Sequence, residues 1–243
     1  MMIVLGALCI GFASIIGGAT GFGSALISTP LMLLFGFSVP EVVVINLVMS
    51  LVTGLNVAYR LRDHIEWTRV ALLGGGGIPG AWLGAETVNL LPEHDLKLAA
   101  GAVVMLAGIG MAIPTRRQAR APSAAAQVAT GVVGGYLSTT TSLNGPPPVL
   151  LLTRARLPPL NFIADLAGYF VVINAVSLVI LWFRNEVPPG VTWPMLSEFV
   201  AAALVGNLAG LWIARQLPVK VFRSTVIVLV IIAGALTIAS GLQ

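Results

Sequence analysis

Apolar stretches of about 20 residues follow one another along the whole chain, and only short polar segments separate them. A helix needs about 20 apolar residues to cross the hydrocarbon core of a bilayer, so this pattern predicts an all-α, multi-pass membrane protein. The stretches with the ordinary length of one span are 40–60, 70–90, 97–114, 159–183, 196–215 and 223–241.

Two further apolar segments, 2–36 and 125–153, are interrupted by glycine, proline and small polar residues. As one straight helix, residues 2–36 would be about 50 Å long, well beyond the ~30 Å hydrocarbon core. Broken at its glycines, the segment forms two arms of about 15 residues, each ~22 Å long. Such arms fold back on each other as a hairpin, and the pattern leaves open whether the hairpin is re-entrant or fully spanning.

The same order of landmarks occurs twice in the chain. The stretch GGATGFGSALISTPLMLL (17–34) resembles GGYLSTTTSLNGPPPVLLL (134–152), and a proline-led apolar stretch with an internal asparagine follows each. A Gly-x-x-x-Gly-x-Trp pattern and a Leu-Pro pair then recur in the same order. We therefore predict two homologous halves, 1–114 and 124–243, which a linker at 115–123 joins into one membrane domain.

The basic residues indicate how the interrupted segments cross the membrane. If each segment crosses once, the lysines and arginines divide six against seven between the two faces. If each segment is a hairpin, one face has only Lys97 and Arg184, and the other face has the remaining eleven. Because basic loops are retained on the cytoplasmic side, the hairpin arrangement is favoured. It predicts a Gly/Pro-broken hairpin and three transmembrane helices in each half, a cytoplasmic linker, and both termini on the extracytoplasmic side.

Three spans after each hairpin reverse the direction of the chain, so the second half enters the membrane from the opposite face. The two halves are then inverted repeats, an organisation typical of secondary transporters. Within the first half, Gly76, Gly80 and Gly84 recur every four residues, which predicts a face for close helix packing.

The composition excludes a soluble domain, since 57% of the residues are hydrophobic, 9% are charged, and the mean hydropathy is +0.97. Cytoplasmic loops explain the net charge of +4, so we predict no nucleic-acid partner. The single cysteine, Cys9, excludes an intramolecular disulfide. With two loop histidines and one cysteine, the sequence offers no metal cluster, and we predict neither a metal nor a cofactor.

The two interrupted segments predict a binding site for a small anion. Irregular backbone at membrane depth is tolerated where it lines a polar cavity, and hairpins from opposite faces bring their tips together near the midplane. The second arm of each hairpin then begins there with unpaired N–H groups and a positive dipole end, Asn144 serving as an N-cap and Pro146 opening the first turn. The predicted binding residues are Thr20, Gly21, Phe22, Gly23, Ser24, Ser138, Thr139, Thr140, Thr141, Ser142, Asn144 and Gly145.

Each of these positions has a structural alternative, because glycines also permit close packing and Ser or Thr also bonds back to its own helix. Asn46, Asn56, Asn174 and Asn207 either line the cavity or form hydrogen bonds between helices. Asp165 is an intramembrane acid, so it either carries a coupling proton or pairs with Arg154 or Arg156.

The stretch TGFGSALISTP, its proline-containing counterpart near the middle of the chain and the two-fold repeat resemble the sulfite exporter TauE/SafE family of membrane permeases. The matching motif positions are Gly18, Gly21, Gly23, Pro30, Gly145 and Pro146–Pro148. The resemblance implies export of sulfite, sulfoacetate or other organosulfonates across the bacterial cytoplasmic membrane. The second half departs from a glycine-rich pattern, because residues 138–142 are rich in hydroxyl groups.

We therefore expect a secondary transporter of small anions, with the lipid bilayer and the anion as its partners. A small-solute or anion channel is the alternative, since paired half-helices also build pores. An intramembrane hydrolase is disfavoured, because no histidine or lysine lies at the depth of Ser24 to activate it. Proton coupling and homo-oligomerisation are both compatible with the sequence and stay open.

Overall fold

The computed structural model describes residues 2–88 and 122–216 without a gap, and between and beyond these ranges only scattered residues of 90–113 and 218–239. The described elements are helical: α1 (Met2–Thr20), α2 (Ser24–Leu34), α3 (Val39–Arg60), the 3-10 turn η1 (Arg62–His64), α4 (Trp67–Thr87), α6 (Ala124–Thr141), α7 (Pro146–Arg154), α8 (Pro159–Phe183) and α9 (Trp193–Ala214). The predicted spans 97–114 and 223–241, and most of the linker 115–123, lie outside the described residues.

Four of the described helices, α1, α3, α8 and α9, are long and apolar enough to cross a membrane. The all-helical architecture is thereby confirmed for the described residues. Sequence signals mark the starts of α3, α8 and α9. For example, Ser38 and Glu41 form a capping box at the start of α3, and a proline opens α8.

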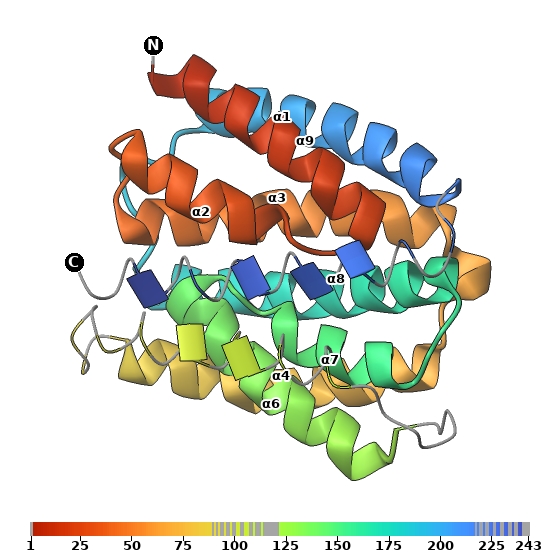
Figure 1. The fold of residues 1–243 in the computed structure, drawn as a ribbon. Coiled ribbons are helices and arrows are strands. Elements are labelled where there is room, and N and C mark those ends of the chain that lie inside the picture. Colours follow the sequence, from red (N-terminus) through yellow and green to blue (C-terminus); the bar gives the residue numbers. More distant parts are fainter. Residues whose placement is uncertain are drawn as a thin grey trace.

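Both interrupted segments are broken where the sequence predicts, but their arms are unequal. The first break separates the 19 residues of α1 from the 11 residues of α2, and the second separates the 18 of α6 from the 9 of α7. In Figure 1, α2 runs back along α1 and α7 runs back along α6, and the two hairpins enter from opposite ends of the molecule. The first arms are therefore nearly as long as a bilayer is thick, and the second arms reach about half as far.

The two halves interlock and do not form separate bundles. Helix α1 of the first half packs along α9 of the second, and α4 of the first half packs along α6 of the second, while α3 and α8 cross in the centre. Small residues make these contacts close: a side chain at Gly76, Gly80 or Gly84 would collide with the backbone of α6. The packing face predicted from these glycines is confirmed.

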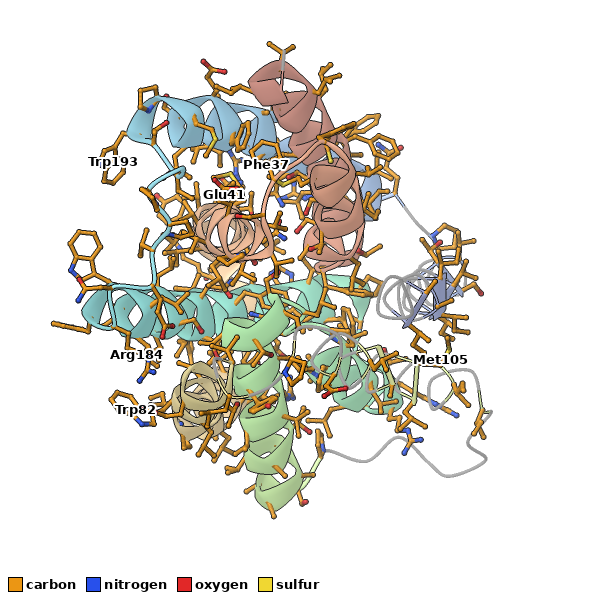
Figure 2. All side chains as sticks on the ribbon, turned by 90° about the vertical axis from the view of Figure 1, so that its left-hand side faces the viewer. Phe37, Glu41, Trp82, Met105, Arg184 and Trp193 are labelled. Carbon is orange, nitrogen blue, oxygen red and sulfur yellow. The ribbon has the colours of Figure 1, made fainter. Side chains whose placement is uncertain are left out.

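The outer surface is apolar and carries aromatic side chains near its ends. Figure 2 looks at the end of the molecule at which α3 begins and shows Trp82 and Trp193 pointing away from the helices. Trp82 is 54% exposed and Trp193 is 84% exposed. Exposed tryptophans are typical of the boundary between lipid and water, so this surface is suited to a bilayer.

Candidate functional site

The two helix breaks meet in the interior of the molecule. A Cβ atom placed on Gly145 of the second break would lie 3.6 Å from Cβ of Phe22 in the first break. A cavity of about 20 Å³ lies between the breaks, and we call it the inter-break cavity. Its walls come from the start of α2 and from the second break, at residues 22–26 and 142–146, together with Ser50 of α3 and Phe170 of α8.

A second cavity, of about 30 Å³, shares part of its walls with the inter-break cavity, and we call it the inner cavity. Phe22, Ser24, Ser50 and Phe170 line both cavities. The inner cavity is also lined by Ser14, Gly17, Gly21, Thr53, Gly54, Val57, Ile163, Ala167 and Asn207. A water molecule needs about 10–15 Å³ of such space, so each cavity has room for one or two waters.

The walls of both cavities are polar without being charged. Among the described residues that line them there is no lysine, arginine, aspartate or glutamate. Their polar groups are hydroxyls, amides and the backbone of the two breaks. Such walls attract an anion through dipoles, which bind it less tightly than a buried cation would.

The first break depends on a glycine at position 21. Gly21 has φ +83°, in the left-handed region that favours glycine, and its N–H donates to Gly17 O at 2.7 Å. A Cβ at this position would lie 3.0 Å from Cα of Ile163, so the tip of the first hairpin packs directly against α8. Thr20 Oγ1 lies 2.8 Å from Ile16 O and 2.5 Å from Phe22 O, so this hydroxyl bonds to the backbone of its own break.

The starts of α2 and α7 differ in their hydrogen-bond donors. Helix α2 begins Ser24-Ala25-Leu26, and the N–H groups of a first turn have no partner within the helix. Helix α7 begins with Pro146, Pro147 and Pro148, which have no N–H group. The expectation of unpaired N–H groups at both helix starts therefore does not hold for α7, whose first three residues have no N–H group, whereas the first turn of α2 has them.

Asn144 does not cap α7, because the N-cap position is occupied by Gly145. Asn144 Nδ2 instead donates to Ser138 Oγ at 3.1 Å and to Asn174 Oδ1 at 2.7 Å. Ser177 of α8 donates to the same Ser138 Oγ at 2.8 Å. This buried network ties the second break to α6 and α8, and within it Asn174 Nδ2 has no hydrogen-bond partner among the described residues.

Asn46 of α3 connects the two hairpins. Its Oδ1 accepts from Ser28 of α2 at 2.7 Å, and its Nδ2 lies 2.9 Å from Thr29 Oγ1 and 3.3 Å from Ser142 Oγ. Ser142 has φ 57° and ends α6, so the side chain of Asn46 stabilises the point at which the second hairpin turns.

Five of the predicted hydroxyl residues are not among the described residues that line the two cavities: Thr20, Ser138, Thr139, Thr140 and Thr141. Thr139 donates to Ala81 O of α4 at 3.0 Å, Thr140 to Tyr136 O at 2.9 Å and Thr141 to Leu137 O at 3.2 Å. Thr139 and Thr140 instead line a larger cavity of about 220 Å³ near the start of α3 and the end of α8, which we call the outer cavity. Its walls are mostly apolar, and Glu186 is the one charged side chain among the described residues that line it.

Asp165 lies beside the start of α4 and is fully buried. Its Oδ1 accepts from Glu66 N at 2.8 Å, and its other oxygen pairs with Arg69. The partner is therefore Arg69, where the sequence suggested Arg154 or Arg156. Asn56 Nδ2 lies 3.4 Å from Asn207 Oδ1, and its own Oδ1 accepts from Arg60 at 3.0 Å.

Sequence reasoning missed the polar residues that α3 and α1 contribute to the inner cavity. Ser50 and Thr53 follow Asn46 at the spacing of one helix face, and this was the signal that could have found them. Ser14 gave no comparable signal, because its place beside the first break results from the packing of α1 against α9. Asn207 of α9 is one of the asparagines expected to line the cavity or to bond between helices, and it does line the inner cavity.

A model of the family described as "Sulfite exporter TauE/SafE" matches residues 6–237. A curated relative, "Probable sulfite/organosulfonate exporter TauE" of Cupriavidus necator, is 27% identical over 178 residues, which cover 71% of this chain and 69% of the relative. No solved structure matches the chain.

Proposed function

Because the chain belongs to the sulfite exporter TauE/SafE family, we propose that it is a secondary transporter that exports small sulfur-containing anions. The family match and the apolar helices make it a multi-pass membrane protein. Sulfite, sulfoacetate and other organosulfonates are the proposed substrates, and the name of the similar protein from Cupriavidus necator supports this class. The bacterial cytoplasmic membrane is the proposed location, with both termini on its outer side.

The observation that carries the proposal is the meeting of the two helix breaks around uncharged polar cavities. We propose that the anion is held by the N–H groups at the start of α2, by the hydroxyls of Ser24 and Ser50, and by the polar second break. The dipole of α7 adds to this field without adding hydrogen bonds, since its first turn is proline. A site of this kind binds an anion weakly enough to release it.

We also propose that the two halves are inverted repeats that move against each other during transport. The opposite directions of the hairpins support this, as does the correspondence between the α1–α9 and α6–α4 contacts. In this mechanism the hairpins rock about the crossing of α3 and α8, so that the binding site opens alternately to the two sides of the membrane.

The small size of the two cavities favours a transporter over a channel. Each has room for only a few waters, and Phe22 lines both of them. An anion therefore needs movement of the walls before it is bound, which is a property of alternating access.

Counterflow in proteoliposomes tests this function. We expect vesicles preloaded with unlabelled sulfite or sulfoacetate to accumulate labelled sulfite, with a rate that saturates as its concentration rises. Chloride and acetate preloads serve as controls for non-specific anion exchange. A rate that rises linearly without saturation would support the channel, and no exchange of any sulfur anion would contradict the proposed substrate class.

A further inference from the structure

One face of α3 is polar from the inner cavity to the end of the helix. Ser50, Thr53, Asn56 and Arg60 lie within about a third of the helix circumference at 3.6 residues per turn. Ser50 and Thr53 line the inner cavity, and Arg60 is the last residue of α3 and is exposed. This face therefore connects the predicted binding region with one end of the molecule.

Side-chain contacts continue the connection across to α9. Asn207 lines the inner cavity, and its Oδ1 lies 3.4 Å from Asn56 Nδ2. Asn56 Oδ1 then accepts a hydrogen bond from Arg60 Nε at 3.0 Å. The amide of Asn56 thus holds Arg60 beside the route, and the Nη groups of the arginine are directed to no carboxylate among the described residues.

The opposite end of the molecule has a different charge arrangement. Arg184 follows α8 and pairs with Glu86 at 2.6 Å and with Glu186 at 3.0 Å, at the end of the molecule seen in Figure 2. Glu186 also lines the outer cavity. The arginine at this end is therefore matched by two carboxylates, whereas Arg60 pairs with no carboxylate among the described residues.

The repeat shows the same asymmetry in the sequence. Asn56 lies sixteen residues after Pro40, and Asn174 lies sixteen residues after Pro158, so the position that corresponds to Arg60 is Leu178. Only the first half therefore places a cation at this point of its central helix. An arginine at the mouth of a polar route raises the local concentration of anions and binds oxyanions through paired N–H groups.

We propose that Arg60 and Asn56 form the loading mouth for the anion, and that export begins at the face of the membrane that bears Arg60. The inference rests on the proposed function and adds the point at which the anion enters the protein. Arg60 captures a sulfite or sulfonate group from solution, and the amides of Asn56 and Asn207 pass it to the inner cavity. On the opposite face, the carboxylates beside Arg184 favour release over rebinding.

The test compares Arg60→Gln with Arg62→Gln in proteoliposomes. Arg62 is a matched control, because it lies two residues away on η1, is exposed, is 4.0 Å from Asp63 and lies over the ring of Tyr59. We expect Arg60→Gln to raise the KM for sulfite by about fivefold or more, with little change in kcat, and to weaken the dependence of KM on ionic strength. Arg60→Lys should recover part of the effect, since the charge is kept.

The effect should depend on the side at which sulfite is supplied. A Cys9→Ser, Arg62→Cys variant, labelled with a membrane-impermeant maleimide, identifies which vesicles expose this face. We expect KM to rise in Arg60→Gln when sulfite is supplied at the Arg60 face, and to stay unchanged from the opposite face.

Equal KM values for Arg60→Gln and Arg62→Gln, in a protein that still transports sulfite, would overturn the loading mouth and leave the proposed function intact. A KM that rises equally in Arg60→Gln from both faces of the membrane would also overturn the loading mouth and leave the proposed function intact. Failure of the wild-type protein to exchange sulfur anions would overturn both. Both substitutions are at exposed side chains, and a folded protein is verified by an unchanged thermal unfolding temperature in detergent.

Discussion

At the scale of single residues, Phe22 has the most direct control over the two cavities. It is 3% exposed, it lines the inner and the inter-break cavity, and Gly145 and Phe170 pack beside it. A Cβ added at Gly145 would be in ordinary van der Waals contact, 3.5 Å from Cζ of Phe170 and 3.6 Å from Cβ of Phe22, so a larger side chain would have to displace these rings. We infer from this position that the side chain of Phe22 separates the two cavities.

Replacement of Phe22 by alanine should join the two cavities into one. We expect Phe22→Ala to increase the passive leak of sulfite and to admit bulkier sulfonates, because the barrier between the cavities is removed. The measurement is the efflux of labelled sulfite and of an aryl sulfonate from proteoliposomes. Phe183→Ala is the control, since Phe183 is 80% exposed. Unchanged efflux and unchanged substrate size in Phe22→Ala would show that Phe22 is not the barrier.

The sequence predicts the place of the site better than it predicts the role of each residue in it. The glycines at 21 and 23 and the asparagine at 144 identify both breaks, because each residue type has a backbone or hydrogen-bonding preference of its own. The hydroxyls at 139–141 have no such preference, and their direction depends on the orientation of α6 against α4. For this reason the sequence placed them beside the anion, whereas they bond to backbone carbonyls.

At the scale of elements, the second break is built to be polar without offering backbone donors. The prolines at 146–148 fix the start of α7 and remove three N–H groups that would otherwise point toward the inter-break cavity. Hydrogen bonds from Asn144 to Ser138 of α6 and to Asn174 of α8 stabilise the same break. In the proposed site, α2 supplies the hydrogen bonds and α7 supplies the shape.

Replacement of Pro146 by alanine should add one donor to this site. We expect Pro146→Ala to bind sulfite up to about fivefold more tightly, since a typical hydrogen bond contributes about 1 kcal/mol, and to turn over more slowly because release becomes harder. Equilibrium binding of labelled sulfite to the purified protein gives Kd, and counterflow gives kcat.

Pro159→Ala, at the start of α8, is the control for the general effect of losing a helix-opening proline. A weaker or unchanged affinity in Pro146→Ala would argue that the start of α7 does not face the anion.

Element boundaries followed from the apolar pattern where the helix is uninterrupted. The stretches 40–60 and 159–183 agree with α3 and α8 to within one residue. The arms of the hairpins were predicted to be equal, but α1 and α6 are about twice as long as α2 and α7. Nothing local sets the length of an arm, because the arm ends where packing against the other half of the chain allows it to turn.

At the scale of the whole molecule, the halves depend on each other for burial. Helix α1 packs mainly against α9, and α4 packs mainly against α6, so neither hairpin is covered by its own half alone. The sequence predicted two similar halves from their shared landmarks, but it contained no signal for this exchange of partners. Contacts between distant segments depend on the shapes of both surfaces, and these follow from the full fold.

The central claim is that the anion is bound where the two breaks meet, and counterflow of labelled sulfite in three variants tests it most directly. In Gly21→Leu the side chain would force the left-handed tip against Ile163, and in Gly145→Leu it would fill the space beside Phe22 and Phe170. Gly75→Leu is the matched control, because an added Cβ there meets nothing within 4 Å. We expect no sulfite exchange in the first two variants, at normal levels of membrane insertion, and full exchange in the third. Retained exchange in both Gly21→Leu and Gly145→Leu would contradict a site between the breaks.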